Sequence, residues 1–272
     1  MKYTVLIRAD EDFDRKVLAQ ALAASRGVPV IDTLPAAMRC WGIVEEDIER
    51  AAAEKLAAEL RAAGLEAYAA ESGALVKLPA ALPVKSLAFT DAGLDAVCEP
   101  REKFTILPDE VSLIAAAIIP HTTIRETAQE QKPGMAQKLQ KTALNLAVPG
   151  LGHVLEAVRP GAQATVRKTG DAGHLLFLDI FVGSPGRRLR FDGNRLQYGF
   201  LGDKMVHSTL INFNLFVKGL VRMAVRAKSN KGARIIQSGR PVREMGYASI
   251  DDMDRESRCI LTGIKQTSSG EP

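Results

Sequence analysis

The order of strands and helices in the first 70 residues constrains the fold of this chain most. The clearest element is a helix predicted over residues 46–63, in which Ile48, Leu56 and Leu60 belong to an apolar stripe spaced by three or four residues. The acidic residues at positions 45, 46, 47 and 49 are expected at its start, where negative charge favours the helix dipole. Gly64 ends the helix, and residues 65–70 alternate as a strand. Upstream, the sequence predicts a strand over 3–8, a helix from 12 or 14 to 25, a short helix over 34–38 and a strand over 39–44, which gives the order β-α-α-β-α-β.

The segment EDIERAAAEKLAAELRAAGLEAYAA, residues 46–70, in this order of elements resembles the C-terminal domain of the bacterial ribosomal stalk protein. The adaptor of the Clp protease shares that fold. Both relatives are docking modules without catalysis, so the resemblance implies a docking-type domain over residues 1–78. The stalk protein docks partly through a Gly/Lys-rich motif between its first two helices. Residues 27–35 contain no lysine, so only the architecture is carried over and not the translation-factor role.

A proline-bracketed linker at residues 78–83 is expected to separate this domain from a strand-rich region over 84–228. Short strands are predicted at 87–90, 93–97, 103–107, 111–119, 174–182, 187–191 and 196–201, with turn residues between them. Residues 129–158 are predicted to be a helical insertion, and a strong amphipathic helix is predicted over 209–227. The polar residues 229–272 are expected to form a partly flexible tail, in which Ile260, Leu261 and Ile264 could dock.

Residues 104–119 and 189–201 resemble bacterial pleckstrin-homology-like domains. This resemblance implies a β-barrel whose open end is closed by the C-terminal helix, and it names no ligand. The predicted fold class is therefore α+β, with a small β-α-α-β-α-β domain followed by a pleckstrin-homology-like barrel.

The charge of the chain is distributed unevenly. Residues 1–100 hold 11 Lys and Arg against 16 Asp and Glu, whereas the remaining residues hold 25 against 16. A basic half can attract anionic partners, or it can simply be a solvated surface. Two basic groups are candidate contacts for an anion or a partner: Lys218, Arg222 and Arg226, which are four residues apart on the predicted helix, and Arg187, Arg188 and Arg190 at the exit of a hairpin. If Leu189 and Phe191 point inward, Arg188 and Arg190 project together from the opposite face.

The sequence indicates no catalytic, cofactor or metal site, and we expect the protein not to be an enzyme. Cys40, Cys98 and Cys259 lie far apart and match neither a zinc site nor a disulfide framework. The four histidines have no ligand spacing, and no serine lies in a nucleophile elbow. The Gly150-Leu151-Gly152 turn lacks the further glycine and the lysine of a phosphate-binding loop. The longest apolar run, residues 113–120, is too short for a membrane span, and no signal segment is recognised, so a cytoplasmic location is expected.

These observations favour a non-catalytic protein-interaction or adaptor protein, whose partner is another protein. The alternative is recognition of an anionic ligand by the basic C-terminal half. Such a ligand could be a phosphorylated molecule, a nucleic acid or a membrane surface. Aromatic residues do not interleave with the basic ones, so no specific nucleic acid is indicated.

Overall fold

The computed structural model describes residues 1–9, 12–99, 102–129, 165–183 and 186–269. The chain divides into two units, Met1–Pro120 with His174–Pro272, and His121–Gly173. All side-chain contacts discussed below belong to the first unit. The helical insertion predicted at 129–158 lies outside the described residues, apart from Gln129 at the end of a strand.

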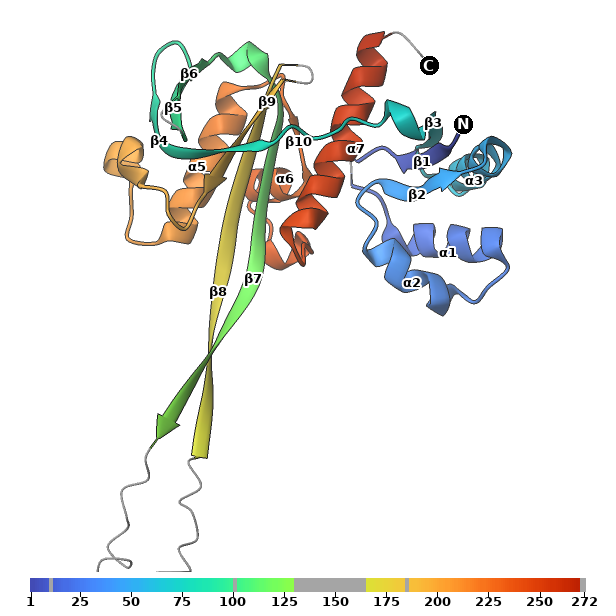
Figure 1. The fold of residues 1–272 in the computed structure, drawn as a ribbon, viewed down its shortest axis with the longest axis horizontal. Coiled ribbons are helices and arrows are strands. Elements are labelled where there is room, and N and C mark those ends of the chain that lie inside the picture. Colours follow the sequence, from blue (N-terminus) through green and yellow to red (C-terminus); the bar gives the residue numbers. More distant parts are fainter. Residues whose placement is uncertain (10–11, 100–101, 130–164, 184–185, 270–272) are drawn as a thin grey trace, which may run out of the picture. The chain divides into compact units, whose positions relative to one another are not determined.

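The N-terminal region has the predicted β-α-α-β-α-β order (Figure 1). Its elements are β1 (Tyr3–Ile7), α1 (Arg15–Arg26), α2 (Val30–Met38), β2 (Ile43–Ile48), α3 (Arg50–Ala62) and β3 (Ala67–Glu71). The three strands form an antiparallel sheet in the order β2-β1-β3. Gly27 ends α1 with a φ of 65°, and Asp14 begins it by accepting a hydrogen bond from the backbone N–H of Lys16 at 2.7 Å.

The acidic run at 45–49 differs from the prediction. It lies mostly in β2 and not in the first turn of a helix, because Glu45 pairs with Val5 of β1 and Ile48 pairs with Tyr3. Helix α3 begins only at Arg50, after Asp47 has taken a positive φ of 59°. Pairing with β1 therefore outweighs the local preference of these residues for a helix start.

Strand β1 belongs to two hydrophobic cores. Val5 and Ile7 pack with Leu18 of α1 and Leu60 of α3. Leu6 points to the other face and packs in a second, larger core together with residues of the following sheet and helices. Since alternate residues of a strand face opposite sides, a strand covered on both faces carries consecutive apolar residues, as Val5, Leu6 and Ile7 do here.

The second region contains a larger mixed sheet. Its strands are β4 (Ala81–Phe89), β5 (Leu94–Cys98), β6 (Glu102–Ile106), β7 (Val111–Gln129), β8 (Thr165–Val182), β9 (Arg187–Asp192) and β10 (Lys228–Ser229). They follow the order β10-β7-β8-β9-β4-β5-β6, with parallel pairing of β4 to β9 and of β10 to β7. Among the described strands this sheet is open, with β10 and β6 at its edges, so the predicted closed barrel is wrong.

Several boundaries in this region also differ from the predictions. The supposed linker at 78–83 runs into β4, where Pro83 pairs with Arg190. The strand predicted at 196–201 is replaced by the turn-like helix η3 (Tyr198–Lys204). Helix α5 (Thr209–Met223) begins at the predicted residue, where Ser208 accepts a hydrogen bond from Ile211, but it ends before the predicted 227.

The tail expected at 229–272 instead contains α6 (Lys231–Ser238), the short helix η4 (Val242–Glu244) and α7 (Ile250–Ser269). Met253 and Cys259 are buried in the larger core, and so are Ile260 and Leu261, as anticipated. Helix α7 contacts both sheets: Cys259 donates to the carbonyl of Ile7 at 3.3 Å, and Asp254 pairs with Arg190 of β9 at 3.0 Å. In the part of the chain that is described, no helix is both long and apolar enough to cross a membrane.

Candidate anion-binding site

The basic residues proposed on α5 do not form one ridge. Lys218 and Arg222 lie on this helix, but Arg226 comes after its end. Arg226 is exposed and lies 3.7 Å from the exposed carboxylate of Asp109. The role of these three residues as contacts for an anion or partner stays a prediction.

Two of the three hairpin arginines, Arg188 and Arg190, pair with carboxylates inside the protein. Leu189 and Phe191 point inward, with exposures of 1% and 0%, and Arg188 and Arg190 share the opposite face, both as predicted. That face is covered, however. Both guanidiniums donate to the fully buried carboxylate of Asp179, Arg188 Nε at 2.7 Å and Arg190 Nε at 2.8 Å. They also bond to Asp254 of α7. Arg187 is exposed and lies over the ring of Phe104, at 4.7 Å from its centroid.

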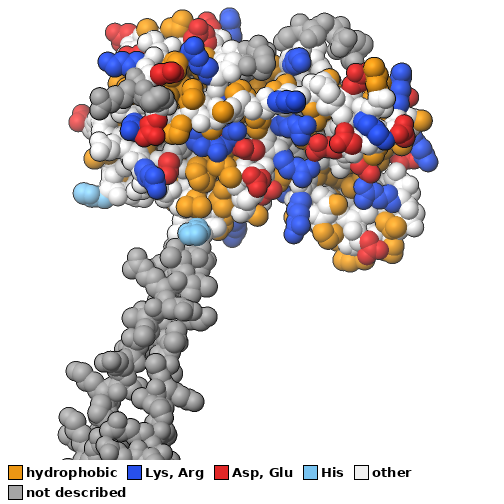
Figure 2. Space-filling model, in the orientation of Figure 1, with side chains coloured by type: hydrophobic (Ala, Val, Ile, Leu, Met, Phe, Trp, Pro, Cys, Tyr) orange, Lys and Arg blue, Asp and Glu red, His pale blue; other side chains and the backbone are white. Residues whose placement is uncertain are grey.

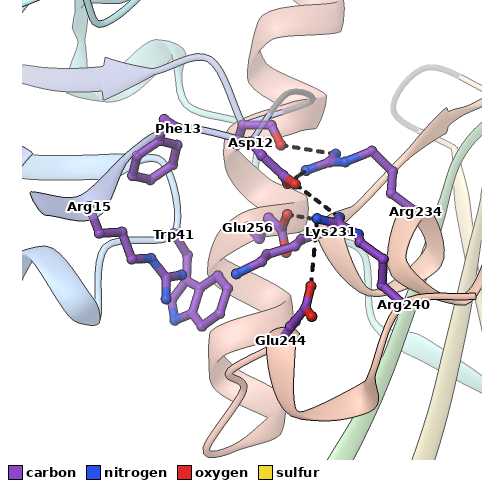
Figure 3. A pocket seen from close by; sticks show the side chains of 10 residues that line it. Asp12, Phe13, Arg15, Trp41, Lys231, Arg234, Arg240, Glu244 and Glu256 are labelled. Carbon is purple, nitrogen blue, oxygen red and sulfur yellow. Dashed lines mark hydrogen bonds and ion pairs between the residues drawn. The ribbon is translucent and has the colours of Figure 1, made fainter. Parts of the chain in front are cut away.

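A different cluster of charged residues surrounds a cavity of about 340 Å³, which we name the Trp41 pocket (Figure 3). Its lining comes from the loop before α1, the start of α1, the turn before β2, α6, the segment around η4, and α7. The lining residues are Ala9, Asp12, Phe13, Arg15, Trp41, Lys231, Arg234, Arg240, Glu244 and Glu256.

The wall of the pocket is aromatic. Trp41 is 3% exposed and stacks on Tyr247, with ring centroids 4.5 Å apart. The guanidinium of Arg15 lies over the same indole at 4.2 Å from the ring centroid, and the amine of Lys231 lies 5.8 Å from it. Cations are attracted to the face of an indole, so Trp41 helps to hold two positive groups close together.

The base of the pocket is fixed by the start of α6. Asn230 begins this helix by accepting a hydrogen bond from Ala233 at 2.9 Å, and its amide also bonds to Ala116 of β7. Glu256 of α7 accepts a hydrogen bond from the backbone N–H of Lys231 at 2.8 Å and another from the Tyr247 hydroxyl. Burial raises the pKa of Glu256 despite these donors. A carboxylate here also faces the positive end of the α6 dipole, which holds it in place.

Two of the four cations in the pocket have carboxylate partners: Asp12 pairs with both arginines, and Glu244 lies 3.8 Å from Arg240. Arg234 donates to the Asp12 carboxylate at 2.9 Å and Arg240 at 3.0 Å. Burial would raise the pKa of Asp12, but the hydrogen bonds and charges of the two arginines outweigh it and lower the pKa. Asp12 is therefore a stable counter-ion for this pair.

The other two cations lack such a partner. Within the described ranges, neither Arg15 nor Lys231 forms an ion pair with a carboxylate. Besides its contact with Trp41, Arg15 forms a 3.4 Å hydrogen bond to the carbonyl of Cys40. Burial lowers the pKa of the Lys231 amine, and the charge of Arg15 lowers it further. Two neighbouring cations that form no ion pair with a described carboxylate, beside a cavity, are suited to hold a carboxylate or a phosphate.

Sequence reasoning missed this pocket because Arg15 and Lys231 are more than two hundred positions apart. The available signals were indirect: the chain has a single tryptophan, and the segment after 230 is rich in arginine. In the ranges that are described, no three His, Cys, Asp or Glu side chains are grouped so that they could hold a metal ion.

Comparison with known proteins supplies no relative from which a ligand could be transferred. No family model matches the chain, and no curated protein or solved structure is significantly similar to it. The resemblances to the stalk-protein and pleckstrin-homology-like domains stay predictions, and no family is shown for this chain.

Proposed function

We propose that this protein binds a small anionic ligand, carrying a carboxylate or a phosphate, in the Trp41 pocket. The observation that supports this function is the convergence of Arg15 and Lys231, two cations without a carboxylate partner in the described chain, over one indole at the edge of a cavity. The placement agrees with the alternative favoured by the charge distribution, because three of the four cations in the pocket come from the basic C-terminal half. The residues differ from those predicted, since the cations at 187–190 and 218–226 lie elsewhere.

Replacing Arg15 by glutamine is expected to weaken phosphate binding by at least about tenfold, because a charge-assisted hydrogen bond contributes about 1.5–3 kcal/mol. Trp41 is the chain's only tryptophan, so its fluorescence reports directly on the pocket during a titration with inorganic phosphate or acetate.

The matched control for this titration is Arg195→Gln, which removes the same charge from an exposed residue that follows β9. This variant should bind phosphate as the unmodified protein does. If neither anion changes the fluorescence, or if both variants weaken binding equally, the pocket is not the anion site.

A second function, protein docking in the manner of an adaptor, is favoured by the exposed surface of α2. Val30, Ile31 and Met38 are 41%, 68% and 53% exposed, whereas Thr33 and Ala37 form the buried side of this helix. Apolar side chains also gather at the lower right of the space-filling view, over the region of α1 and α2 (Figure 2). Contiguous apolar surface of this kind is typical of a contact with another protein. We propose that a partner protein with an apolar contact surface binds here, and that this role involves no catalysis.

The double replacement of Ile31 and Met38 by glutamate is expected to abolish recovery of a stoichiometric partner when the tagged protein is used for capture from bacterial lysate, because burying a charge at an apolar contact is costly. Val225→Glu, at a more exposed apolar residue that lies outside α2, should leave the recovery unchanged. Equal recovery with both variants would show that α2 is not the contact surface.

We propose that residues 1–78 are a docking module related to the stalk-protein domain, supported by the β-α-α-β-α-β order. A pleckstrin-homology-like origin for residues 84–228 is supported only by successive strands followed by an amphipathic helix, and it is weakened by the open sheet. A cytoplasmic location is consistent with three free, buried cysteines.

A further inference from the structure

The amine of Lys231 has an environment unlike that of an ordinary surface lysine. It lines the Trp41 pocket beside the indole and points toward the same region as Arg15 (Figure 3). Its backbone is held by Glu256 and by the Asn230 cap, so the side chain starts from a fixed position. The amine itself has no carboxylate partner among the described residues, so its nitrogen is available to a ligand.

We propose that Lys231 captures the ligand of the Trp41 pocket covalently, as an imine, and that this ligand is an aldehyde or a 2-oxo acid carrying a carboxylate or phosphate. The proposal rests on the proposed anion-binding function. Arg15 would hold the anionic group, and the carbonyl carbon would then face the Lys231 nitrogen. Holding two reacting groups side by side replaces a bimolecular encounter by a local one, which raises the effective concentration of the carbonyl.

The electrostatics of the pocket support a nucleophilic amine. Burial and the charge of Arg15 lower the pKa of Lys231, and Arg240 acts in the same direction. Asp12 and Glu256 act in the opposite direction, and the net pKa is still below that of a free lysine. A larger fraction of this amine is therefore uncharged at neutral pH, which is the form that attacks a carbonyl.

The reaction needs no further reagent. The nitrogen lone pair forms a bond to the carbonyl carbon, the carbonyl oxygen takes up a proton and the nitrogen loses one to water. The resulting hydroxyl then leaves as water after accepting a proton from the solvent, the nitrogen lone pair completes the C=N bond, and the remaining proton on nitrogen returns to the solvent. One amine and one carbonyl thus give one imine and one water, and the step is reversible.

The proposal is tested by trapping on the full chain with pyridoxal 5′-phosphate, an aldehyde that carries a phosphate. The protein is treated with a limiting amount of this probe, reduced with borohydride, digested and analysed by mass spectrometry. We expect Lys231 to be labelled about tenfold more than Lys218, a half-buried lysine on α5, because Lys231 combines a lowered pKa with a neighbouring anion site. Inorganic phosphate and the variant Arg15→Gln should both suppress this labelling. Pyridine-4-carboxaldehyde, which lacks the phosphate, should not label Lys231 selectively.

Labelling spread evenly over the lysines would overturn the proposal, and so would selective labelling by the uncharged aldehyde. The variant Lys231→Arg has no primary amine at this position, so it should lose the reduced adduct. Phosphate binding without selective labelling of Lys231 would overturn the imine and leave the anion site standing. Selective labelling that phosphate does not suppress, with no fluorescence response to anions, would overturn the anion site and with it this proposal.

Discussion

Replacing Asp179 by asparagine is expected to lower the free energy of unfolding by about 3–5 kcal/mol, the typical loss when one partner of a buried ion pair is removed. Asp179 is fully buried on β8 and accepts hydrogen bonds from Arg188 Nε and from two nitrogens of Arg190. Asparagine has the same shape but no charge, so the 5% exposed side chain of Arg188 would keep only Asp254 as a counter-ion. Urea unfolding followed by circular dichroism measures the loss as a lower midpoint with an unchanged slope.

The control for Asp179 is Asp109→Asn. Asp109 pairs with Arg226 at 3.7 Å, and both side chains are more than three quarters exposed. Water and salt screen such a pair, so the change in stability should stay below about 0.5 kcal/mol. Similar losses in the two variants would mean that the Asp179 network does not hold β8, β9 and α7 together.

The second large effect is expected at Gly232, where alanine should cost about 3 kcal/mol of stability. A Cβ atom at this residue would lie 1.9 Å from the carbonyl oxygen of Ala116 and 3.1 Å from the ring of Tyr247. Helix α6 would have to move away from β7, which would stretch the Asn230 hydrogen bonds to Ala116. Thermal and urea unfolding measure the loss, and the fluorescence of Trp41 should change because Tyr247 stacks on it.

Gly219→Ala is the matched control, since it places the same methyl group inside another helix. The Cβ atom at Gly219 would meet only the ring of Phe89, at an ordinary contact distance of 3.7 Å. Alanine is favoured over glycine in a helix by about 1 kcal/mol, so this variant should be slightly more stable. If both glycine variants changed the free energy of unfolding in the same direction, the result would contradict the close approach of α6 and β7.

The N-terminal region could be predicted well because its signals are local. Gly27 and Gly64 mark helix ends, and the apolar spacing around Leu56 and Leu60 identifies α3 without knowledge of the rest of the chain. The predicted start of α3 is too early, since residues 45–49 suit a helix start in sequence and only their pairing with β1 makes them a strand. Local patterns cannot show which strand lies next to them in space.

The C-terminal half was harder to predict because its order depends on distant contacts. Nothing near β9 in sequence indicates that it pairs with β4, about a hundred residues earlier. The last helices did leave signals: Asn230 and Gly239 flank α6 as cap residues, but the polar composition of the segment concealed them. The charged clusters also depend on distant contacts. The basic residues at 188 and 190 could be recognised from the sequence, but their partner Asp254 on α7 could not.

The double role of β1 has a consequence for any attempt to divide this protein. A fragment ending at residue 78 would leave Leu6, Trp41, Ile43 and Ala70 without the neighbours that cover them in the intact chain. Such a fragment would expose an extended apolar face of its sheet to water and would aggregate, even if its own helices were fully formed. A loss of function after truncation at the proline-rich junction would therefore reflect misfolding of the fragment. Point substitutions are the better way to locate a function in either half of the chain.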